Sequence, residues 1–272
     1  PIMILTLDMG IAGAAWATVI SRMIFCIVAV YSLFAGRWRK GIKLHLAHLK
    51  PEGRWLKKIA KVGMPASLGQ SSAALGFVIM NAFIVGFGEN TLAAFGIGNR
   101  INSLVLMPSM GIGSALATIV GQNIGYGDID RAGLAVRRSL QLSVLLSAVG
   151  GIVLFLLSGP VMEVFTDSPD VYAQGVEYLR WICAGIFLMA IFQVYVGVFQ
   201  GSGHTVMAMI LMAGRLLVVR IPLIVLLSRL FDLGSQAIWY SLLLSNAIAC
   251  VVGALMYLSG RWKRAVIHTQ EG

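Results

Sequence analysis

Long apolar runs alternate with short polar breaks along the whole chain. Seven runs contain enough residues to span about 30 Å of hydrocarbon at about 1.5 Å per helical residue. They cover residues 11–35, 62–87, 92–122, 139–157, 171–199, 206–227 and 235–259. The pattern predicts an all-α integral membrane protein, a polytopic helical bundle of about seven transmembrane helices.

The composition agrees with a membrane protein. Of 272 residues, 58% are hydrophobic and 12% are charged, and the mean hydropathy is +0.85; a soluble domain has roughly 25% charged residues. The net charge of +10 does not indicate a nucleic acid partner, because the bases cluster in short loops between apolar runs. The expected partner is therefore the lipid bilayer. The three cysteines lie in apolar runs, where we interpret them as small buried residues and not as disulfide partners.

Charged residues divide between alternate loops. Bases lie between the first and second spans, between the third and fourth, and after the last: Arg37, Arg39, Lys40, Lys43, Lys50, Arg54, Lys57, Lys58, Lys61, Arg131, Arg137, Arg138, Arg261, Lys263 and Arg264. The other loops contain mainly acids: Glu89, Glu163, Asp167, Asp170 and Asp232. The positive-inside rule predicts a multi-pass protein of the cytoplasmic (inner) membrane, with the C-terminus in the cytoplasm.

Two short tracts indicate an internal repeat. Asp8-Met9-Gly10 and Asp232-Leu233-Gly234 each precede a span that runs inward, which favours a parallel repeat; a chance match between apolar tracts is the alternative. We therefore expect a second six-helix half plus the last helix of a first half. Residues 1–35 would end the N-terminal lobe (the tail of its fifth helix and its sixth helix), 36–61 form a basic cytoplasmic linker, 62–260 the C-terminal lobe and 261–272 a cytoplasmic tail.

The run 92–122 is an unusual membrane helix, because it contains Arg100 and Pro108. Each costs free energy in hydrocarbon unless protein or water satisfies it, so this helix is expected to line a cavity. Ser103 and Met107 share a face with Arg100. Either this face lines a cleft, with Arg100 paired to a carboxylate of the absent lobe, or Arg100 is paired locally or extends to the outer surface. Pro108 is expected to act as a hinge.

Amide side chains also recur at helical spacing. Gln70 and Asn81 are three turns apart in the second span, and Gln193 and Gln200 are two turns apart in the fifth. Amides suit a cavity for varied ligands because they donate and accept without charge; the alternative is bonding between helices, about 0.6 kcal/mol each. The predicted substrate cavity comprises Gln70, Asn81, Arg100, Ser103, Met107 and Gln193.

Catalytic and metal-binding patterns are not apparent. The glycine-rich stretch 121–127 follows no strand and precedes no Lys-Ser/Thr pair, so it predicts a helix end with a glycine C-cap and not a phosphate loop. The histidines, His45, His48, His204 and His268, lie in or beside loops without the partners of a metal site. We expect no enzyme activity, cofactor or metal.

Four stretches together resemble the C-terminal lobe of the MATE (multidrug and toxic compound extrusion) transporters. They are GMPASLGQSS at 63–72, AAFGIGNRINSLVLMPSMGIGSALATIVGQNIGYGD at 93–128, FQGSGHT at 199–205 and RIP at 220–222. The resemblance implies half of a twelve-helix, two-lobe transporter, a monomer when full length. It also implies a cleft that opens alternately to each side, and export of organic, often cationic, compounds in exchange for Na⁺ or H⁺.

One departure from the family pattern concerns the coupling ion. Some members place acids in the seventh and tenth helices, where this chain has LGQSSAALG and FLMAIFQVY. Glu177 lies closest, but we expect it to pair with Arg180. The ion site is therefore expected in the absent N-terminal lobe. The alternative function is a related flippase for lipid-linked oligosaccharide or another lipid-like substrate, for which Arg22, Arg100, Arg215 and Arg220 would suit a more cationic cleft; a membrane scaffold or a membrane-embedded enzyme is a rival from another class.

Overall fold

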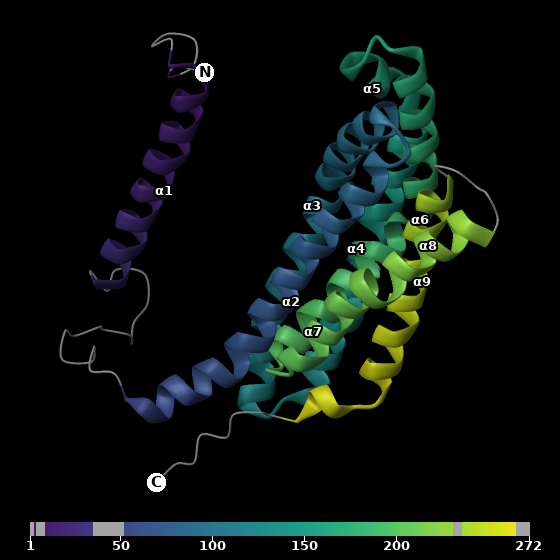
Figure 1. Cartoon of the computed structure of the whole chain (residues 1–272). Coiled ribbons are helices and arrows are strands. Elements are labelled where there is room, and N and C mark those ends of the chain that lie inside the picture. Colours follow the sequence, from purple (N-terminus) through teal and green to yellow (C-terminus); the bar gives the residue numbers. More distant parts are fainter. Residues whose placement is uncertain (1–2, 4–8, 35–51, 231–235, 265–272) are drawn as a thin grey trace. The chain divides into compact units, whose positions relative to one another are not determined.

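The computed structural model describes residues 3, 9–34, 52–230 and 236–264 (Figure 1). The chain divides into two compact units, Pro1–Leu56 and Lys57–Gly272. Secondary structure within the described residues is helical. The predicted all-α class is confirmed.

The first unit contains one long helix, α1 (Gly10–Phe34). Most of its described side chains are exposed, and Phe25 is 74% exposed. A helix that is apolar on all sides and exposed within its own unit needs lipid or other helices around it.

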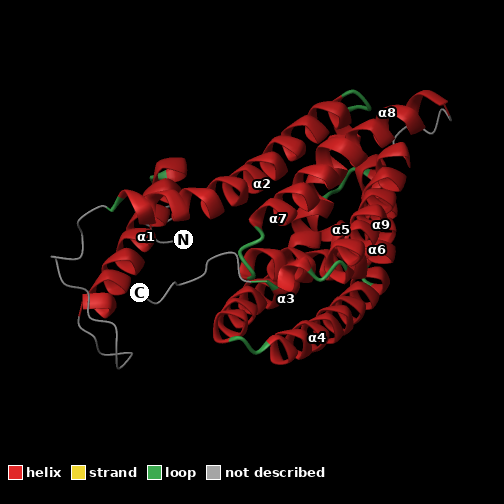
Figure 2. Cartoon of the chain, turned by 90° about the horizontal axis from the view of Figure 1, so that it is seen from below, coloured by secondary structure: helices red, strands yellow, loops and turns green. Residues whose placement is uncertain are grey.

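The second unit is a bundle of long helices. The helices from α2 onward are α2 (Gly53–Val85), α3 (Glu89–Tyr126), α4 (Ile129–Leu156), α5 (Ser158–Phe165), α6 (Pro169–Gly201), α7 (Thr205–Ala213), the π-helix η3 (Gly214–Arg220), α8 (Ile221–Leu230), α9 (Gln236–Leu258) and the 3₁₀-helix η4 (Arg261–Lys263). Figure 2 shows α6 beside α3, α4 and α9, each of which packs against it.

Seven described helices are long and apolar enough to cross a membrane, as predicted. Several boundaries differ from the prediction, most of all at the starts of two helices. The fourth span was expected to begin at Ser139, whereas α4 begins at Ile129. The second span was expected to begin at Val62, whereas α2 begins at Gly53, because hydropathy marks the apolar part of a helix and not its basic first turns. The short helix α5 lies where only an acidic loop was expected.

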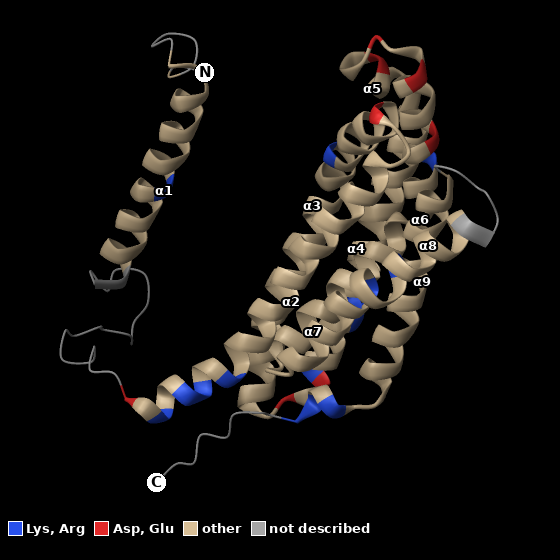
Figure 3. Cartoon of the chain, viewed as in Figure 1, with Lys and Arg blue, Asp and Glu red and all other residues tan. Residues whose placement is uncertain are grey.

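Charges separate along the second unit. Most charges at the α3–α4 turn and around η4, at one end, are bases, although Asp128 and Asp130 also lie there. At the other end, α5 and the adjoining turns carry acids (Figure 3). This separation agrees with the alternation of basic and acidic loops. Which end faces the cytoplasm stays a prediction.

Small residues bring α3 and α6 close together. A Cβ atom at Gly197 would overlap the carbonyl of Gly113, and one at Gly201 would overlap the backbone of Ala117. Helices in lipid gain little from hydrophobic association, so close backbone approach through small residues is how they pack. This contact fixes α6 as the centre of the bundle.

The helix ends on the basic side are capped by local chemistry. Gly127 has a φ of +91° and donates its N–H to the carbonyls of Asn123 and Ile124. Asp128 then accepts a hydrogen bond from the Arg131 N–H at the start of α4. The glycine C-cap predicted for the stretch 121–127 is confirmed.

The first residues after α9 pack on the bundle. Trp262 is 1% exposed, stacks on Tyr257 at 5.0 Å between ring centres and donates its Nε1–H to the Tyr257 carbonyl. The predicted cytoplasmic tail therefore begins with an anchored turn, and residues 265–272 lie outside the described residues.

Candidate functional site

A cavity of about 240 Å³ lies within the second unit, among α2, α3, α6, η3 and α9. Its aromatic wall consists of Phe77, Phe95, Tyr178, Trp181 and Trp239. Its polar lining consists of Asn99, Asn102, Ser103, Arg215, Arg220 and Asn246. The described lining contains two cations and no Asp or Glu.

Three aromatic rings form a packed wall of this cavity. The ring centres of Phe95 and Tyr178 lie 5.5 Å apart, and those of Tyr178 and Trp239 lie 4.6 Å apart. All three side chains are nearly fully buried. Because each ring contacts the next, the three side chains form a continuous and mainly apolar wall.

The arginines come from the π-helix in the middle of the sixth span. There, the Ile221 N–H donates to the Leu216 carbonyl five residues earlier. In an α-helix of 3.6 residues per turn, positions five apart point about 140° away from each other, whereas the i→i+5 pattern stacks them. The π-helix therefore places Arg215 and Arg220 on the same face. Pro222, which has no N–H to continue an α-helical ladder, follows directly.

Both guanidinium groups share one acceptor on α9. Arg215 Nη1 lies 3.0 Å from Asn246 Oδ1, and Arg220 Nη2 lies 2.8 Å from the same oxygen. Arg220 Nε also donates to Ser245 Oγ at 2.8 Å, and this arginine is only 5% exposed.

Arg215 has weaker further partners. Its Nη1 lies 3.1 Å from the sulfur of Met189, and its Cζ lies 4.6 Å from the centre of the Phe192 ring. The described contacts of the two arginines are therefore with neutral groups.

Some polar atoms of the lining lack a partner within the described structure. They are Arg215 Nε, Trp239 Nε1 and Asn102 Oδ1, all buried. A buried polar atom without a hydrogen bond costs about 1–3 kcal/mol. Two donors and one acceptor of the lining residues are therefore unsatisfied, and side chains enclose all three atoms.

Residues 65–226, more than half of the chain, match the model of the MatE family. The chain belongs to the MatE family. The resemblance found in the sequence is thereby confirmed, and the chain is a multi-pass membrane protein of this family.

Two curated relatives of this MATE chain have names that describe drug export. A probable multidrug resistance protein NorM of Thermotoga maritima is 27% identical over 264 residues, which cover 97% of this chain and 56% of the relative. The multidrug export protein MepA of Staphylococcus saprophyticus is 25% identical over 259 residues, which cover 94% of this chain and 55% of the relative.

A solved transporter structure is also similar to this chain. An outward-facing multidrug resistance MATE family transporter of the MOP superfamily matches with a TM-score of 0.88 and 26% identity, over 96% of this chain and 59% of that one. The MATE chain thus spans between 55% and 59% of the length of these proteins.

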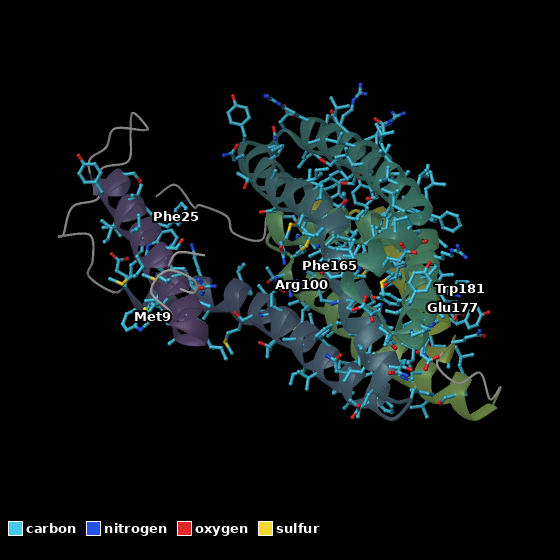
Figure 4. The ribbon with its side chains drawn as sticks, turned by 90° about the horizontal axis from the view of Figure 1, so that it is seen from above. Met9, Phe25, Arg100, Phe165, Glu177 and Trp181 are labelled. Carbon is cyan, nitrogen blue, oxygen red and sulfur yellow. The ribbon has the colours of Figure 1, made fainter. Side chains whose placement is uncertain are left out.

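Of the six predicted cavity residues, Ser103 lines the MATE cavity. Arg100 and Met107 are exposed and are not part of its lining. In the view of Figure 4, Arg100 lies on one side of the second unit and Trp181 and Glu177 lie on the other. Arg100, Ser103 and Met107 lie at helical spacing on one face of α3, but only Ser103 of these three lines the cavity.

The three predicted amides lie elsewhere in the MATE lobe. Gln70 is exposed and lines a separate shallow depression together with Gln200. Asn81 and Gln193 are half-buried and do not line the cavity. The second unit does not bring the predicted set together. A role for these residues toward the other lobe, and bending at Pro108 within the continuous helix α3, stay predictions.

The predicted pairing of Glu177 with Arg180 is wrong. Glu177 accepts a hydrogen bond from Gln236 Nε2 at 3.1 Å, and Arg180 lies over the ring of Phe155 at 5.8 Å. Although the two residues are three positions apart on α6, the first faces α9 and the second faces α4.

Sequence reasoning missed the centre of the cavity. Arg215 and Arg220 were noted only as support for the flippase alternative, and Asn246 was not singled out. The signal available in the sequence was two bases within the run 206–227, since ionisable residues in a membrane span mark functional sites.

The turn between α6 and α7 contains one residue with a shifted pKa. Partial burial lowers the pKa of His204, although a hydrogen bond of its Nδ1 with the Ser202 carbonyl opposes the shift. His204 is therefore neutral in the folded MATE lobe at neutral pH.

Proposed function

We propose that this chain forms the C-terminal lobe and the last N-terminal-lobe helix of a transporter that exports small organic compounds by alternating access. The observation that carries the proposal is the cavity lined by five membrane-spanning segments, with an aromatic wall and unsatisfied polar atoms. Pockets of this kind bind small molecules through apolar contact and a few convergent polar groups. The names of the relatives support xenobiotics as the exported class.

The energy source belongs to the same proposal. A membrane potential supplies only about 2.3 kcal/mol per charge per 100 mV, so export requires a group that binds an ion or a proton. The described cavity lining has no carboxylate. We place the Na⁺ or H⁺ site in the N-terminal lobe, and the C-terminus in the cytoplasm. A gradient of either ion, imposed on proteoliposomes of the full-length protein, should drive uptake or release of a fluorescent substrate.

The names of the curated relatives favour xenobiotic export over the flippase alternative. The cavity of about 240 Å³ belongs to one lobe, and its volume lies below the range of about 300–1,000 Å³ usual for drug-sized ligands. It therefore holds a compact molecule or one part of a larger substrate.

Drug susceptibility tests the proposal. The full-length gene, expressed in a host that lacks its own exporters, should raise resistance to at least one compound of a broad panel. Trp181→Ala removes a wall of the cavity and is expected to lower that resistance at least tenfold. Phe187→Ala changes an exposed aromatic residue on the same helix that does not line the cavity, and should leave resistance intact. Unchanged resistance in both variants, at equal membrane levels, would exclude a transport role for this cavity.

A further inference from the structure

Two cations without an acid distinguish this cavity: Arg220 is buried and Arg215 is half-buried. Arginine keeps its charge in proteins, and buried charges are normally paired with an opposite charge. Arg215 and Arg220 instead share the neutral oxygen of Asn246. The other described arginines of the long helices differ: Arg180, for example, is exposed and lies against an aromatic ring. The cavity therefore carries positive charge that its own described residues do not neutralise.

The free polar atoms indicate the same kind of ligand. Arg215 Nε and Trp239 Nε1 are donors without acceptors. A guanidinium fork matches the paired oxygens of a carboxylate or sulfonate, and such charge-assisted bonds are stronger than neutral ones. An acceptor-rich anionic group would neutralise both charges and, after a small shift of the enclosing side chains, would accept from both donors.

The remaining lining is apolar. Phe95, Tyr178 and Trp239 form a continuous ring cluster, and Leu106 and Ile186 also line the cavity. About 240 Å³ accommodates one or two fused rings beside a small charged group. The lining thus provides one charged end and one apolar wall.

We propose that this cavity binds compact aromatic anions, with the carboxylate or sulfonate held by Arg215 and Arg220 through the register of the π-helix. The inference rests on the proposed function, since it names a substrate class for the same cavity. It differs from the cationic compounds that the family resemblance implies.

Binding measurements on the purified full-length protein test the inference. The probes are 2-naphthoate and its neutral counterpart 2-naphthamide, titrated by calorimetry in a non-ionic detergent. Wild-type protein should bind the naphthoate at least tenfold more tightly. Arg215→Gln should weaken naphthoate binding roughly 10- to 100-fold, the range of a charged hydrogen bond, and should leave naphthamide binding unchanged. Arg180→Gln is the matched control and should change neither Kd.

Two further variants test the inference if Arg215→Gln does not fold. Arg215→Lys keeps the charge and should retain naphthoate binding within a few fold. Asn102→Asp adds a carboxylate to the cavity lining with almost no change of shape, and should weaken naphthoate binding at least tenfold while sparing naphthamide.

Three results would overturn the inference. The first is equal affinity of wild-type protein for the two probes, and the second is an unchanged naphthoate Kd in Asn102→Asp. The third is a lower melting temperature of Arg215→Gln with unchanged naphthoate affinity, which would assign Arg215 to the packing of this lobe through Asn246 and Phe192. Intact drug export with no naphthoate binding would remove this inference alone; naphthoate binding without export of any compound would instead remove the proposed function.

Discussion

Two helix contacts in the second unit show opposite ways of packing in hydrocarbon. Between α3 and α6 the backbones touch through Gly113 and Gly197, and no side chain fits between them there. Between η3 and α9 long charged side chains converge on Asn246. The first contact has no capacity left for a ligand, whereas the second retains unpaired donors. The α3–α6 contact joins the helices of the bundle, whereas the η3–α9 contact provides hydrogen-bonding groups at the cavity.

The largest expected effect comes from opening the first contact. Gly197→Leu would place a side chain against the Gly113 carbonyl, and we expect a cost of about 4 kcal/mol or more, enough to prevent folding. Fluorescence-detected size-exclusion chromatography should show aggregate in place of a monodisperse peak. Gly111→Ala, at a position with open space around the glycine, should elute like wild type. A monodisperse, thermally stable Gly197→Leu protein would show that α3 and α6 do not depend on this approach.

A smaller loss is expected from the second contact. Asn246→Ala removes the shared acceptor of Arg215 and Arg220 and should cost about 2–3 kcal/mol, since bonds to charged groups contribute about 1.5–3 kcal/mol. Thermal unfolding of the purified protein measures the difference.

The matched substitution at this position sharpens the comparison. Asn246→Asp supplies a carboxylate between the two guanidinium groups, so it should melt at or above the wild-type temperature. If Asn246→Ala and Asn246→Asp were equally destabilising, the arginines would not depend on the charge or hydrogen bonds offered by α9.

The smallest expected effect on stability concerns His204 in the turn between α6 and α7, which connects the α3–α6 contact to the segment that contains η3. Burial lowers the pKa of His204, so the unfolded chain binds a proton there at a higher pH than the folded lobe does. Stability should therefore decrease as the pH falls through the usual histidine value of about 6.5, until the folded-state pKa is reached. Melting temperatures at pH 8 and pH 5 should differ more for wild type than for His204→Gln. An equal difference would assign the acid sensitivity to other groups.

The spans were predictable because hydropathy is a local property. Each apolar run is long enough to cross hydrocarbon, and each became a helical segment of membrane length, the sixth from α7, η3 and α8 together. The glycine cap at Gly127 was predictable for the same reason, since the left-handed conformation and its two hydrogen bonds involve only adjacent residues. The start of α2 at Gly53 was not predictable from hydropathy, because the basic first turns of this helix are helical without being apolar.

The cavity was not predictable from α-helical periodicity. Arg215 and Arg220 fall on different faces of an α-helix, and only the π-helical ladder brings them to one acceptor. Arg100, Ser103 and Met107 were correctly predicted to share one face of a helix. Helical spacing alone, however, does not show which other helix packs against that face. Glu177 illustrates the same limit, since its partner Gln236 comes from a helix 59 positions away in the chain.

The π-helix also changes how the sixth span should be aligned and engineered. Each of its turns contains about one residue more than an α-turn, so the phase of α8 is offset from that of α7 by about 100° per added residue. Deleting a single residue between Gly214 and Arg220 would rotate every side chain of α8 by that angle while leaving the composition of the span almost the same. Substitution tolerance along this span should consequently follow two separate helical wheels that meet at the π-turn.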